Sequence, residues 1–555
     1  MASTRLIVPP PARSRGNIAG PASLLARMAR LKKPLAPAAI PETPEAKARV
    51  QAREPLGGPF GIAEKIFGID VRSLALFRIC LALILIGDLL YRAQDLRAHY
   101  TDAGVLPIAL ASVFQQQHWW WSLHNLHPAL PLEIMLFLVE GLFALSLLVG
   151  YRTRTASVVC WLLLISLQNR NVLILTGGDT MLRVLAFWAM FLPLGVRWSV
   201  DRALDKSDKP MPKRIFSVAT VALIVQLASV YLFGALLKTG PTWRTDHTAI
   251  YYALSIGQFA TPLAKFLLHY PDLLKTLTFL TWNLEFLAPF LILASAFSGP
   301  LRTVVVLAYM GFHISLGLCM ELGLFPIIGA LAWLVLMPDW FWQTLFRLWA
   351  RLPSRLSPTF DPGLIARVAV WRDHLHPQSV SIRTPRAIQA LAVFYLTYVT
   401  CWNIRTLDFN RHVHWFPITW NWIGEITRMD QSWELFAPDP MKTQAWMVVP
   451  ATLADGEEVD LKSEVSPVNW NLPPLISVTY YNERWRKYLM NISEETDQNQ
   501  CFAYASYLSN RWNAAHSFAQ RVKKVSVVLK RSPTTLPNAP RVEPATVELF
   551  KGEYP

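Results

Sequence analysis

The sequence is poor in charge and in cysteine. Charged residues make up 16% of the 555 residues, whereas hydrophobic residues make up 53%. This composition excludes a disordered chain, collagen and a coiled coil, and it is too apolar for a string of ordinary water-soluble domains. Five cysteines are too few for a disulfide scaffold, and none forms a CxxC pair, so no metal is expected. The composition therefore indicates an integral membrane protein.

Common catalytic and nucleic-acid motifs are also missing. The sequence contains no P-loop, GxSxG or GxGxxG motif, and no nucleic-acid-binding fingerprint stands out. The net charge of +15 is instead concentrated in the connections between apolar runs, where Lys and Arg meet anionic lipid head groups. We therefore expect membrane lipid as a partner and no nucleic acid.

Apolar runs of about twenty residues, the length that crosses the hydrocarbon core of a bilayer, recur along the chain. Because backbone hydrogen bonds must be satisfied internally in lipid, these runs predict helices. The expected fold is an all-α polytopic membrane bundle of about nine transmembrane helices with a small C-terminal α+β extramembrane domain. The predicted spans are Leu74–Tyr91, Leu132–Gly150, Ala156–Leu175, Met181–Val196, Ile215–Leu237, Leu274–Ala296, Leu301–Met320, Leu322–Phe341 and Ala387–Ile404.

Basic connections follow the second, fourth, sixth and eighth predicted spans. With nine spans they all fall on one side, which the positive-inside tendency assigns to the cytoplasm. We expect a multi-pass protein of the cell (inner) membrane, with its N terminus in the cytoplasm and no cleavable signal peptide in Met1–Gly20. The expected regions are a disordered basic cytoplasmic tail (1–65), a transmembrane bundle (66–342), a cytoplasmic loop (343–386), the last transmembrane helix (387–405) and a small exported α+β domain (406–555).

The predicted exported domain alternates short β-like runs with amphipathic segments. Its strands are expected in runs rich in β-branched and aromatic residues, bounded by turn signals. The predicted strands are Trp446–Leu453, Ile476–Tyr481 and Val525–Leu529, and the predicted helices are Tyr481–Met490 and Phe502–His516.

Lys238 closes the fifth predicted span, in the sequence LFGALLKTGPTW. An ionisable residue in a span is costly and therefore suggests function. In one interpretation the lysine extends its ammonium group to the membrane interface. In the other it is buried in an apolar cavity, which lowers its proton affinity and lets it act as a base. Gly240, Pro241 and Trp243 predict a turn at the interface, where such a cavity can form.

Polar residues also gather between the third and fourth predicted spans, in QNRNVLILTGGDTMLR. Asp179 and Arg183 are four residues apart, so they are expected to pair on one helix face. Arg170 and Asn171, together with the two glycines before Asp179, predict a close-packed re-entrant corner in which backbone or ligand approaches closely.

Two further ionisable residues lie in later spans. Glu285 is expected to face the bundle interior, either paired or protonated. His313 has no HxxxH spacing around it, so it is interpreted as a hydrogen-bonding residue rather than a metal ligand. The His- and Trp-rich segment 118–127 predicts an interfacial aromatic belt rather than a metal site.

Four segments together resemble a known family. FRICLALILIGDLLYR, the QNRN…GGD corner, GALLKTGPTW and GFHISLGLCMELGLFP are similar in order and spacing to the HTTM superfamily, the bacterial membrane relatives of vitamin K-dependent γ-glutamyl carboxylase. The resemblance covers about Ile66–Trp342. The WELFAPDP segment, Trp433–Pro440, and the small outer domain also resemble bacterial members. Lipase maturation factors show a more distant similarity around the lysine segment.

The resemblance implies a lysine-base chemistry. In the carboxylase, a membrane-embedded lysine deprotonates vitamin K hydroquinone, oxygen converts it to an epoxide, and the strong base so formed removes a γ-proton of a peptide glutamate before CO2 adds. Lys238 matches that lysine, Trp243 follows at the matching spacing, and His313 matches a later histidine. Asn171 or its neighbour Arg170 stands where the carboxylase has a second functional histidine. The implied site has Lys238, His313 and Asn171 as catalytic residues, Arg170, Asp179, Trp243 and Glu285 as substrate-binding residues, and a reduced quinone such as vitamin K hydroquinone with O2 and CO2 as cofactors.

Two classes of function stay open. The first is a quinol-linked lysine-base enzyme, a carboxylase- or epoxidase-like lyase acting on an exported or lipid-soluble substrate. The second is a non-enzymatic membrane maturation or assembly factor that holds an exported protein or peptide through its outer domain. A channel or carrier is less well supported, because no pair of similar halves is evident in the sequence.

Overall fold

The structure is a computed structural model, and it describes residues 59–116, 118–205, 211–351, 384–407, 416–494, 498–535 and 542–553. Most of the predicted cytoplasmic tail and most of the predicted cytoplasmic loop lie outside these residues. The chain divides into two compact units, Met1–Gly61 and Ile62–Pro555. The description below concerns the second unit.

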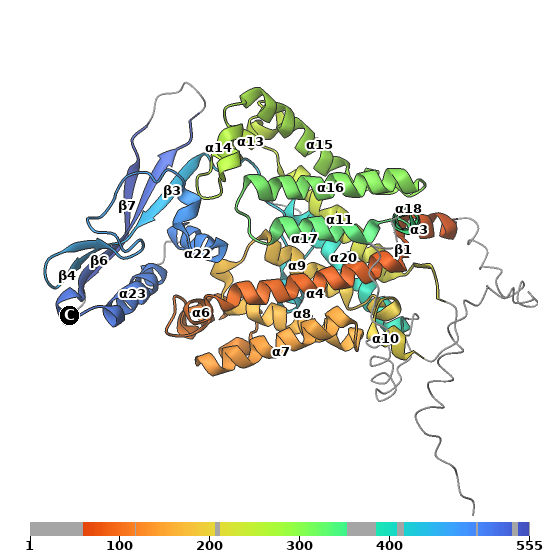
Figure 1. Cartoon of the computed structure of the whole chain (residues 1–555), viewed down its shortest axis with the longest axis horizontal. Helices are drawn as coiled ribbons and strands as arrows, with labels where there is room; N and C mark the ends of the chain where they lie inside the picture. Colours follow the sequence, from red (N-terminus) through yellow and green to blue (C-terminus); the bar gives the residue numbers. More distant parts are fainter. Residues whose placement is uncertain are drawn as a thin grey trace, which may run out of the picture. The chain divides into compact units, whose positions relative to one another are not determined.

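Long helices form a bundle around two central members, α4 and α11 (Figure 1). In α4 (Val71–Ala93) and α11 (Val218–Leu237), 67% of the apolar stretch is buried, compared with 17% in α15 (Pro271–Ser295). The exposed apolar residues of the outer helices face lipid in a membrane protein. The other main helices are α7 (Leu130–Val149), α8 (Thr153–Arg170), α9 (Gly177–Ala189), α16 (Gly299–Cys319), α17 (Phe325–Ala332), α18 (Asp339–Ala350) and α20 (Arg386–Thr406).

Nine membrane spans are not confirmed. Among the described residues, six helices are long and apolar enough to cross a membrane, or seven if the bent pair 325–336 and 339–350 counts as one span. The predicted span Met181–Val196 is interrupted, because α9 ends at Ala189 and Pro193 precedes a short 3-10 turn. The predicted span Leu322–Phe341 is not one straight helix, since the chain bends by 95° before α18.

The two ends of the bundle differ in their contacts. At one end, named here the arginine end, Ile69 pairs with Ile215, and Arg302 Nη2 donates to the carbonyl oxygen of Ile66 at 2.8 Å. At the opposite end, named the domain end, Arg484 of the C-terminal region contacts Asp88 near the end of α4. The C-terminal sheet and helices therefore pack on the end away from the basic connections.

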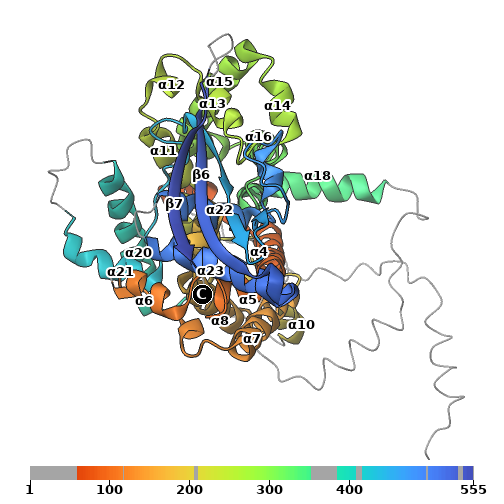
Figure 2. The same ribbon diagram turned by 90° about the vertical axis from the view of Figure 1, so that its left-hand side faces the viewer.

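The C-terminal region contains a small antiparallel sheet (Figure 2). Strand β6 (Val522–Pro533) pairs with β7 (Ala545–Glu553) on one edge and with β3 (Thr443–Val448) and β4 (Pro450–Leu453) on the other, and β5 (Glu458–Asp460) pairs with β4. Helices α22 (Glu483–Glu494) and α23 (Gln498–Ala515) share a hydrophobic core with the sheet.

Most of the strand and helix predictions for this region hold, with one exception. Trp446–Leu453 and Val525–Leu529 lie in strands, and the two predicted helices correspond to α22 and α23. The predicted strand Ile476–Tyr481 is wrong, because Ile476–Thr479 forms a 3-10 helix. The side chain of Ile476 is buried against Trp446 and Val448 of β3, so this apolar run covers the sheet and does not extend it.

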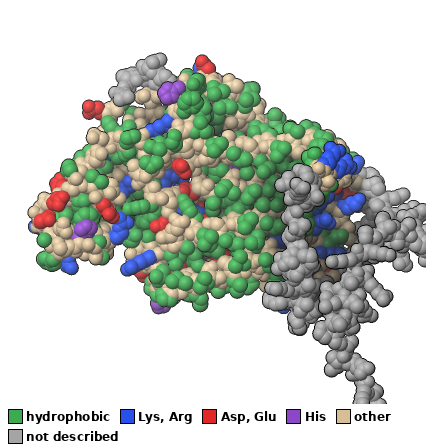
Figure 3. All heavy atoms as spheres, viewed as in Figure 1, with side chains coloured by type: hydrophobic (Ala, Val, Ile, Leu, Met, Phe, Trp, Pro, Cys, Tyr) green, Lys and Arg blue, Asp and Glu red, His purple; other side chains and the backbone are tan. Residues whose placement is uncertain are grey.

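The C-terminal region packs against the bundle, and the two share one hydrophobic core. Tyr488 and Met447 belong to the same buried cluster as Leu106 and Ile174 from the bundle. Trp433 is fully buried among the bundle helices. Figure 3 shows hydrophobic side chains spread over the flank of the bundle, with most charged side chains toward its two ends, as expected for a protein surrounded by lipid.

Candidate functional site

Lys238 caps the carboxyl end of α11. Its side chain is 3% exposed, and its Nζ donates to Oε2 of Glu285, which is 12% exposed, at 2.5 Å. The ring centre of Trp243 lies 5.0 Å from Nζ. The ammonium group is thus withdrawn from water. Glu285 is paired, one of the two states that its sequence position suggested.

The sequence around Lys238 explains its position. The apolar run 218–237 forms α11, which begins with a capping box between Ser217 and Thr220. Pro241 starts a second, short helix, α12 (Pro241–Arg244), directly after the lysine. Arg244 Nε donates back to the carbonyl oxygen of Lys238 at 2.8 Å. The chain therefore folds back at this point and places Trp243 over the lysine.

A segment of the C-terminal region closes over this turn. The amide of Gly240 donates to the carbonyl oxygen of Pro438 at 3.0 Å, and Trp243 Nε1 donates to that of Phe436 at 2.9 Å. Asp439 Oδ1 accepts from the amide of Thr242 at 3.1 Å. A Cβ at Gly240 would lie 2.2 Å from the Asp439 carboxylate, so only glycine permits this close approach.

His313 belongs to a buried aromatic cluster next to the lysine turn. Its Nε2 lies 2.7 Å from Tyr231 Oη, which also accepts from Trp333 Nε1 at 2.6 Å. Tyr309 stacks on Trp333 with ring centres 3.8 Å apart. The other imidazole nitrogen, Nδ1, is buried and has no hydrogen-bond partner among the described residues. His313 is thus a hydrogen-bonding residue, with one nitrogen left over.

The lysine pair and the histidine cluster share helix α11, and a hydrogen bond from α16 to α15 also links them. Tyr231 and Lys238 are seven residues apart on α11, or about 10 Å along the helix axis. Tyr309 Oη donates to the carbonyl oxygen of Leu284, the residue before Glu285, at 2.5 Å. Among the described residues, Lys238 bonds to Glu285 and His313 bonds to Tyr231, so the two groups are neighbours through α11 and α15 rather than hydrogen-bonding partners.

Arg170 and Asn171 lie elsewhere, at the end of α8. Asn171 Nδ2 donates to the carbonyl oxygen of His99 at 3.0 Å, and Arg170 Nη1 donates to that of Leu106 at 2.9 Å. Both side chains are fully buried. They fasten the chain that follows α4, and their contacts do not include Lys238 or His313.

The predicted ion pair between Asp179 and Arg183 is wrong. Arg183 Nη2 instead lies 3.3 Å from Asp430 Oδ2, and Asp179 pairs with two other arginines. Asp179 is the third residue of α9 and also closes a capping box with Thr176. Its carboxylate is thereby held toward the helix N-terminus, away from the side chain one turn later.

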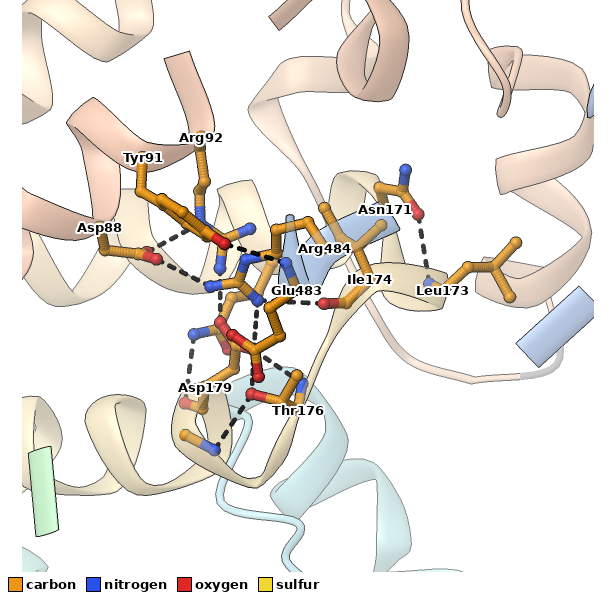
Figure 4. A network of polar contacts seen from close by, with 12 residues as sticks. Asp88, Tyr91, Arg92, Asn171, Leu173, Ile174, Thr176, Asp179, Glu483 and Arg484 are labelled. Carbon is orange, nitrogen blue, oxygen red and sulfur yellow. Dashed lines mark hydrogen bonds and ion pairs between the residues drawn. The ribbon is translucent and has the colours of Figure 1, made fainter. Parts of the chain in front are cut away.

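Asp179 is part of a closed ring of four buried charges (Figure 4). Arg92 contacts Asp88 at 2.7 Å and Asp179 at 2.5 Å. Arg484 contacts the remaining oxygen of each carboxylate, Asp88 Oδ1 at 2.8 Å and Asp179 Oδ2 at 2.5 Å. Burial and the neighbouring Arg92 act to lower the pKa of Arg484, but the two carboxylates outweigh them and raise it. The ring joins α4, α9 and α22.

Most of this ring could not be predicted from the sequence. The spacing of Asp88 and Arg92, four residues apart on one helix, was an available signal for the first pair. Arg484 lies almost four hundred residues from Asp88 in the chain and inside an amphipathic segment rich in Arg and Lys. Nothing local distinguishes it from a solvated arginine.

The His- and Trp-rich segment forms separate carboxylate pairs. His124 Nδ1 lies 2.6 Å from Glu133 Oε2, and His118 Nδ1 lies 3.3 Å from Glu425 Oε1. Across the described parts of the chain, no group of three His, Cys, Asp or Glu side chains is placed to hold a metal ion. The candidate site is therefore the Lys238–Glu285 pair with Trp243 and the His313 cluster, while Arg170, Asn171 and Asp179 belong to the domain-end contacts.

Comparison with known proteins identifies the bundle. The HTTM domain model matches residues 68–340, a range that includes Lys238, Glu285 and His313 but not Arg484. No curated protein and no solved structure matches the chain. Residues 68–340 of this chain are therefore an HTTM domain.

Proposed function

We propose that this protein is a membrane enzyme in which the Lys238–Glu285 pair is the base for a reduced quinone, such as vitamin K hydroquinone, in a reaction with O2 and CO2 on an exported or lipid-soluble substrate. The observation that carries the proposal is the lysine ammonium withdrawn from water, 2.5 Å from a carboxylate. Burying an ionisable side chain in a membrane helix costs free energy, so its presence there suggests a function.

The pair offers two positions for one proton. When the proton sits on Glu285 Oε2, Lys238 Nζ has a free lone pair and accepts a proton from an acidic O–H group. Glu285 then holds the displaced proton, and Trp243 covers the ammonium face 5.0 Å away. A reduced quinone, when bound, supplies the acidic O–H and the reducing equivalents.

His313 offers one unused hydrogen-bonding atom to a ligand oxygen. Nδ1 of His313 is a buried polar atom without a partner in the described part of the chain. The rings of Phe312 and Phe325 lie 5.4 Å and 5.6 Å from the imidazole. An oxygen on an apolar ring satisfies the nitrogen without adding charge, and an unsatisfied buried nitrogen costs about 1–3 kcal/mol.

The test is quinol oxidation by purified protein in lipid nanodiscs. Lys238→Ala is expected to lower the rate by two to four orders of magnitude, the usual range for loss of a general base. Lys275→Ala is the matched control, because Lys275 is exposed on the same α15 helix that carries Glu285. Unchanged turnover in Lys238→Ala, at a normal melting temperature, overturns the proposal.

We also infer that the arginine end faces the cytoplasm and that the C-terminal region is exported from a bacterial inner membrane. Basic connections gather at one end, as the positive-inside tendency requires. Six long apolar helices cross by length and composition, and counting α8, α9 and the shorter α17 as three further passes gives nine. Because nearly all of α9 is buried, its surroundings are protein and it needs no lipid-spanning length. This supports nine spans.

A maturation or assembly factor for exported proteins is the second candidate. The observation that favours it is the shared core and charge ring that hold the C-terminal region rigidly on the bundle. Such a platform suits a partner protein or peptide. In this case Lys238→Ala retains the cellular function, whereas deleting residues 428–555 abolishes it.

A further inference from the structure

Helix α18 (Asp339–Ala350) leaves the bundle sideways. The chain bends by 95° between the α17 segment and α18, and Figure 2 shows α18 extending away from the other helices. Pro338 is the residue before the helix. Because α17 runs along the bundle, a helix at nearly a right angle to it runs parallel to the membrane plane.

Only the first turn of α18 is anchored to the bundle. Trp342 Nε1 donates to Ser73 Oγ at 2.8 Å, and Asp339 forms an ion pair with Arg72. The Trp342 ring also meets Trp198, with ring centres 5.6 Å apart. These contacts fix the direction of the helix and leave its last two turns free of other described elements.

The free turns of α18 are strongly amphipathic. Asp339, Gln343, Arg347 and Arg351 follow one another at four-residue intervals and therefore form one polar stripe. Four large apolar side chains on the other side are 39–55% exposed: Leu345, Phe346, Leu348 and Trp349. A face with Trp, Phe and Leu opposite a stripe with arginine is typical of helices that lie in the membrane interface.

The start of α18 lies next to the exposed apolar surface of α16. The start of α18 packs on the start of α16, where a Cβ on Gly299 would lie 2.4 Å from the Trp340 side chain. Directly above this contact, Leu301 and Val304 of α16 are exposed toward the surroundings. Helix α18 thus begins beside the first turn of α16, where the exposed apolar residues of that helix start and where Arg302 lies.

We infer that α18 is an in-plane helix that binds an anionic lipid leaflet at the arginine end. Its Leu345, Leu348 and Trp349 side chains enter the acyl region, while Arg347 and Arg351 contact anionic head groups. The occupant of the exposed face is lipid, because α18 leaves the bundle beside the exposed apolar start of α16, and its free turns carry Arg347 and Arg351 and no acidic residue. This inference does not depend on the proposed quinol chemistry.

The experiment places a fluorescent probe on single cysteines in full-length protein. The five native cysteines are first replaced, and the variant is accepted only with an unchanged melting temperature. Leu345→Cys and Trp349→Cys report the apolar face, and Gln343→Cys on the polar stripe is the matched control. In phosphatidylglycerol nanodiscs, a lipid carrying a doxyl quencher near its head group is expected to quench both apolar-face probes several-fold more than the Gln343 probe.

Three outcomes overturn the inference. Equal quenching at positions 343 and 345 means that α18 does not lie in the interface. No quenching at 345 or 349, with loss of solvent access, means that another protein or a second copy covers the face. If quenching in phosphatidylcholine equals that in phosphatidylglycerol, or if Arg347→Gln with Arg351→Gln leaves the phosphatidylglycerol preference unchanged, the anionic selectivity is wrong.

Discussion

At the scale of single residues, variants of the Lys238–Glu285 pair distinguish a structural role from a catalytic role. Glu285→Leu leaves the Lys238 ammonium buried without its partner, which is expected to cost about 3 kcal/mol of unfolding free energy, at the low end for buried pairs because Glu285 keeps some exposure. The double variant Lys238→Met with Glu285→Leu removes both charges and is expected to recover most of that loss. Denaturant titration in detergent measures both values.

The same double variant tests the chemistry independently of folding. It is expected to be stable but inactive in quinol oxidation, because neither Nζ nor Oε2 is left to hold a proton. If it keeps native turnover, the pair is a structural ion pair and the base lies elsewhere. If the double variant is less stable than Glu285→Leu alone, the ion pair is not the reason for the lysine's burial.

His99, outside the membrane-spanning segments, makes stability depend on pH. Burial, and then the nearby Arg484 and Arg92, lower the pKa of His99 from 6.5 to about 3. The unfolded chain therefore binds more protons than the folded one between pH 6.5 and about 3, so the free energy of unfolding falls as the pH drops through this window. At pH 5 the loss from this residue is about 2 kcal/mol.

The measurement compares wild type with His99→Gln at pH 7 and pH 5. Glutamine is neutral at both values, so the variant should lose less stability on acidification than wild type, by about 2 kcal/mol. The His99 ring is tilted against Trp485 of α22 with ring centres 4.5 Å apart, and the acid-induced loss should therefore appear as weaker docking of the C-terminal region. Parallel pH profiles for the two proteins would show that His99 is not the titrating group.

At the scale of elements, Arg484 fastens α22 to the bundle. Arg484→Met leaves one oxygen of Asp88 and one of Asp179 without an arginine in a buried site, which is expected to cost about 3–5 kcal/mol. Arg511→Met is the control, because its ion pair with Glu464 is exposed and should contribute less than about 1 kcal/mol. Limited proteolysis should cut the C-terminal region much faster in Arg484→Met only.

The turn at Gly240 depends on its lack of a side chain. In Gly240→Ala the new Cβ would meet the Asp439 carboxylate at 2.2 Å, so this carboxylate must turn away and lose its hydrogen bonds from Thr242. We expect a melting temperature lowered by several degrees and a reduced rate of quinol oxidation. Gly87→Ala in α4, with no atom within 4 Å of its Cβ, should be neutral or slightly stabilising. Equal effects of the two substitutions would show that the 436–439 segment does not need this close approach.

The elements that the sequence predicts well are those set by local composition. Long apolar runs located α4, α11, α15, α16 and α20, because length and hydrophobicity suffice to specify a helix that can span a membrane. The i, i+4 rule failed at Asp179 because it describes an isolated helix, whereas this carboxylate meets arginines from two distant elements. The ring and the 433–440 cover over Lys238 depend on contacts between residues hundreds of positions apart.

At the scale of the whole molecule, charge and packing divide the protein into two unlike ends. The segment between α8 and α9 fits under the C-terminal region, where Asn491 Nδ2 donates to the carbonyl oxygen of Leu173 at 2.7 Å. The arginine end carries none of these domain contacts in the described residues. Orientation in the membrane therefore decides which compartment supplies a substrate to the C-terminal region.

Single-cysteine labelling of intact cells tests this orientation. Thr155, in the first turn of α8, is exposed at the arginine end, and Asn471, in the C-terminal region, is exposed at the domain end. If basic connections stay in the cytoplasm, a membrane-impermeant maleimide labels Asn471→Cys before lysis and Thr155→Cys only afterwards. The opposite labelling pattern would mean that the C-terminal region lies in the cytoplasm and that Lys238 is near the cytoplasmic face. Labelling of both positions before lysis would mean that the helices between them do not separate the two ends by a membrane, which is incompatible with an odd number of spans.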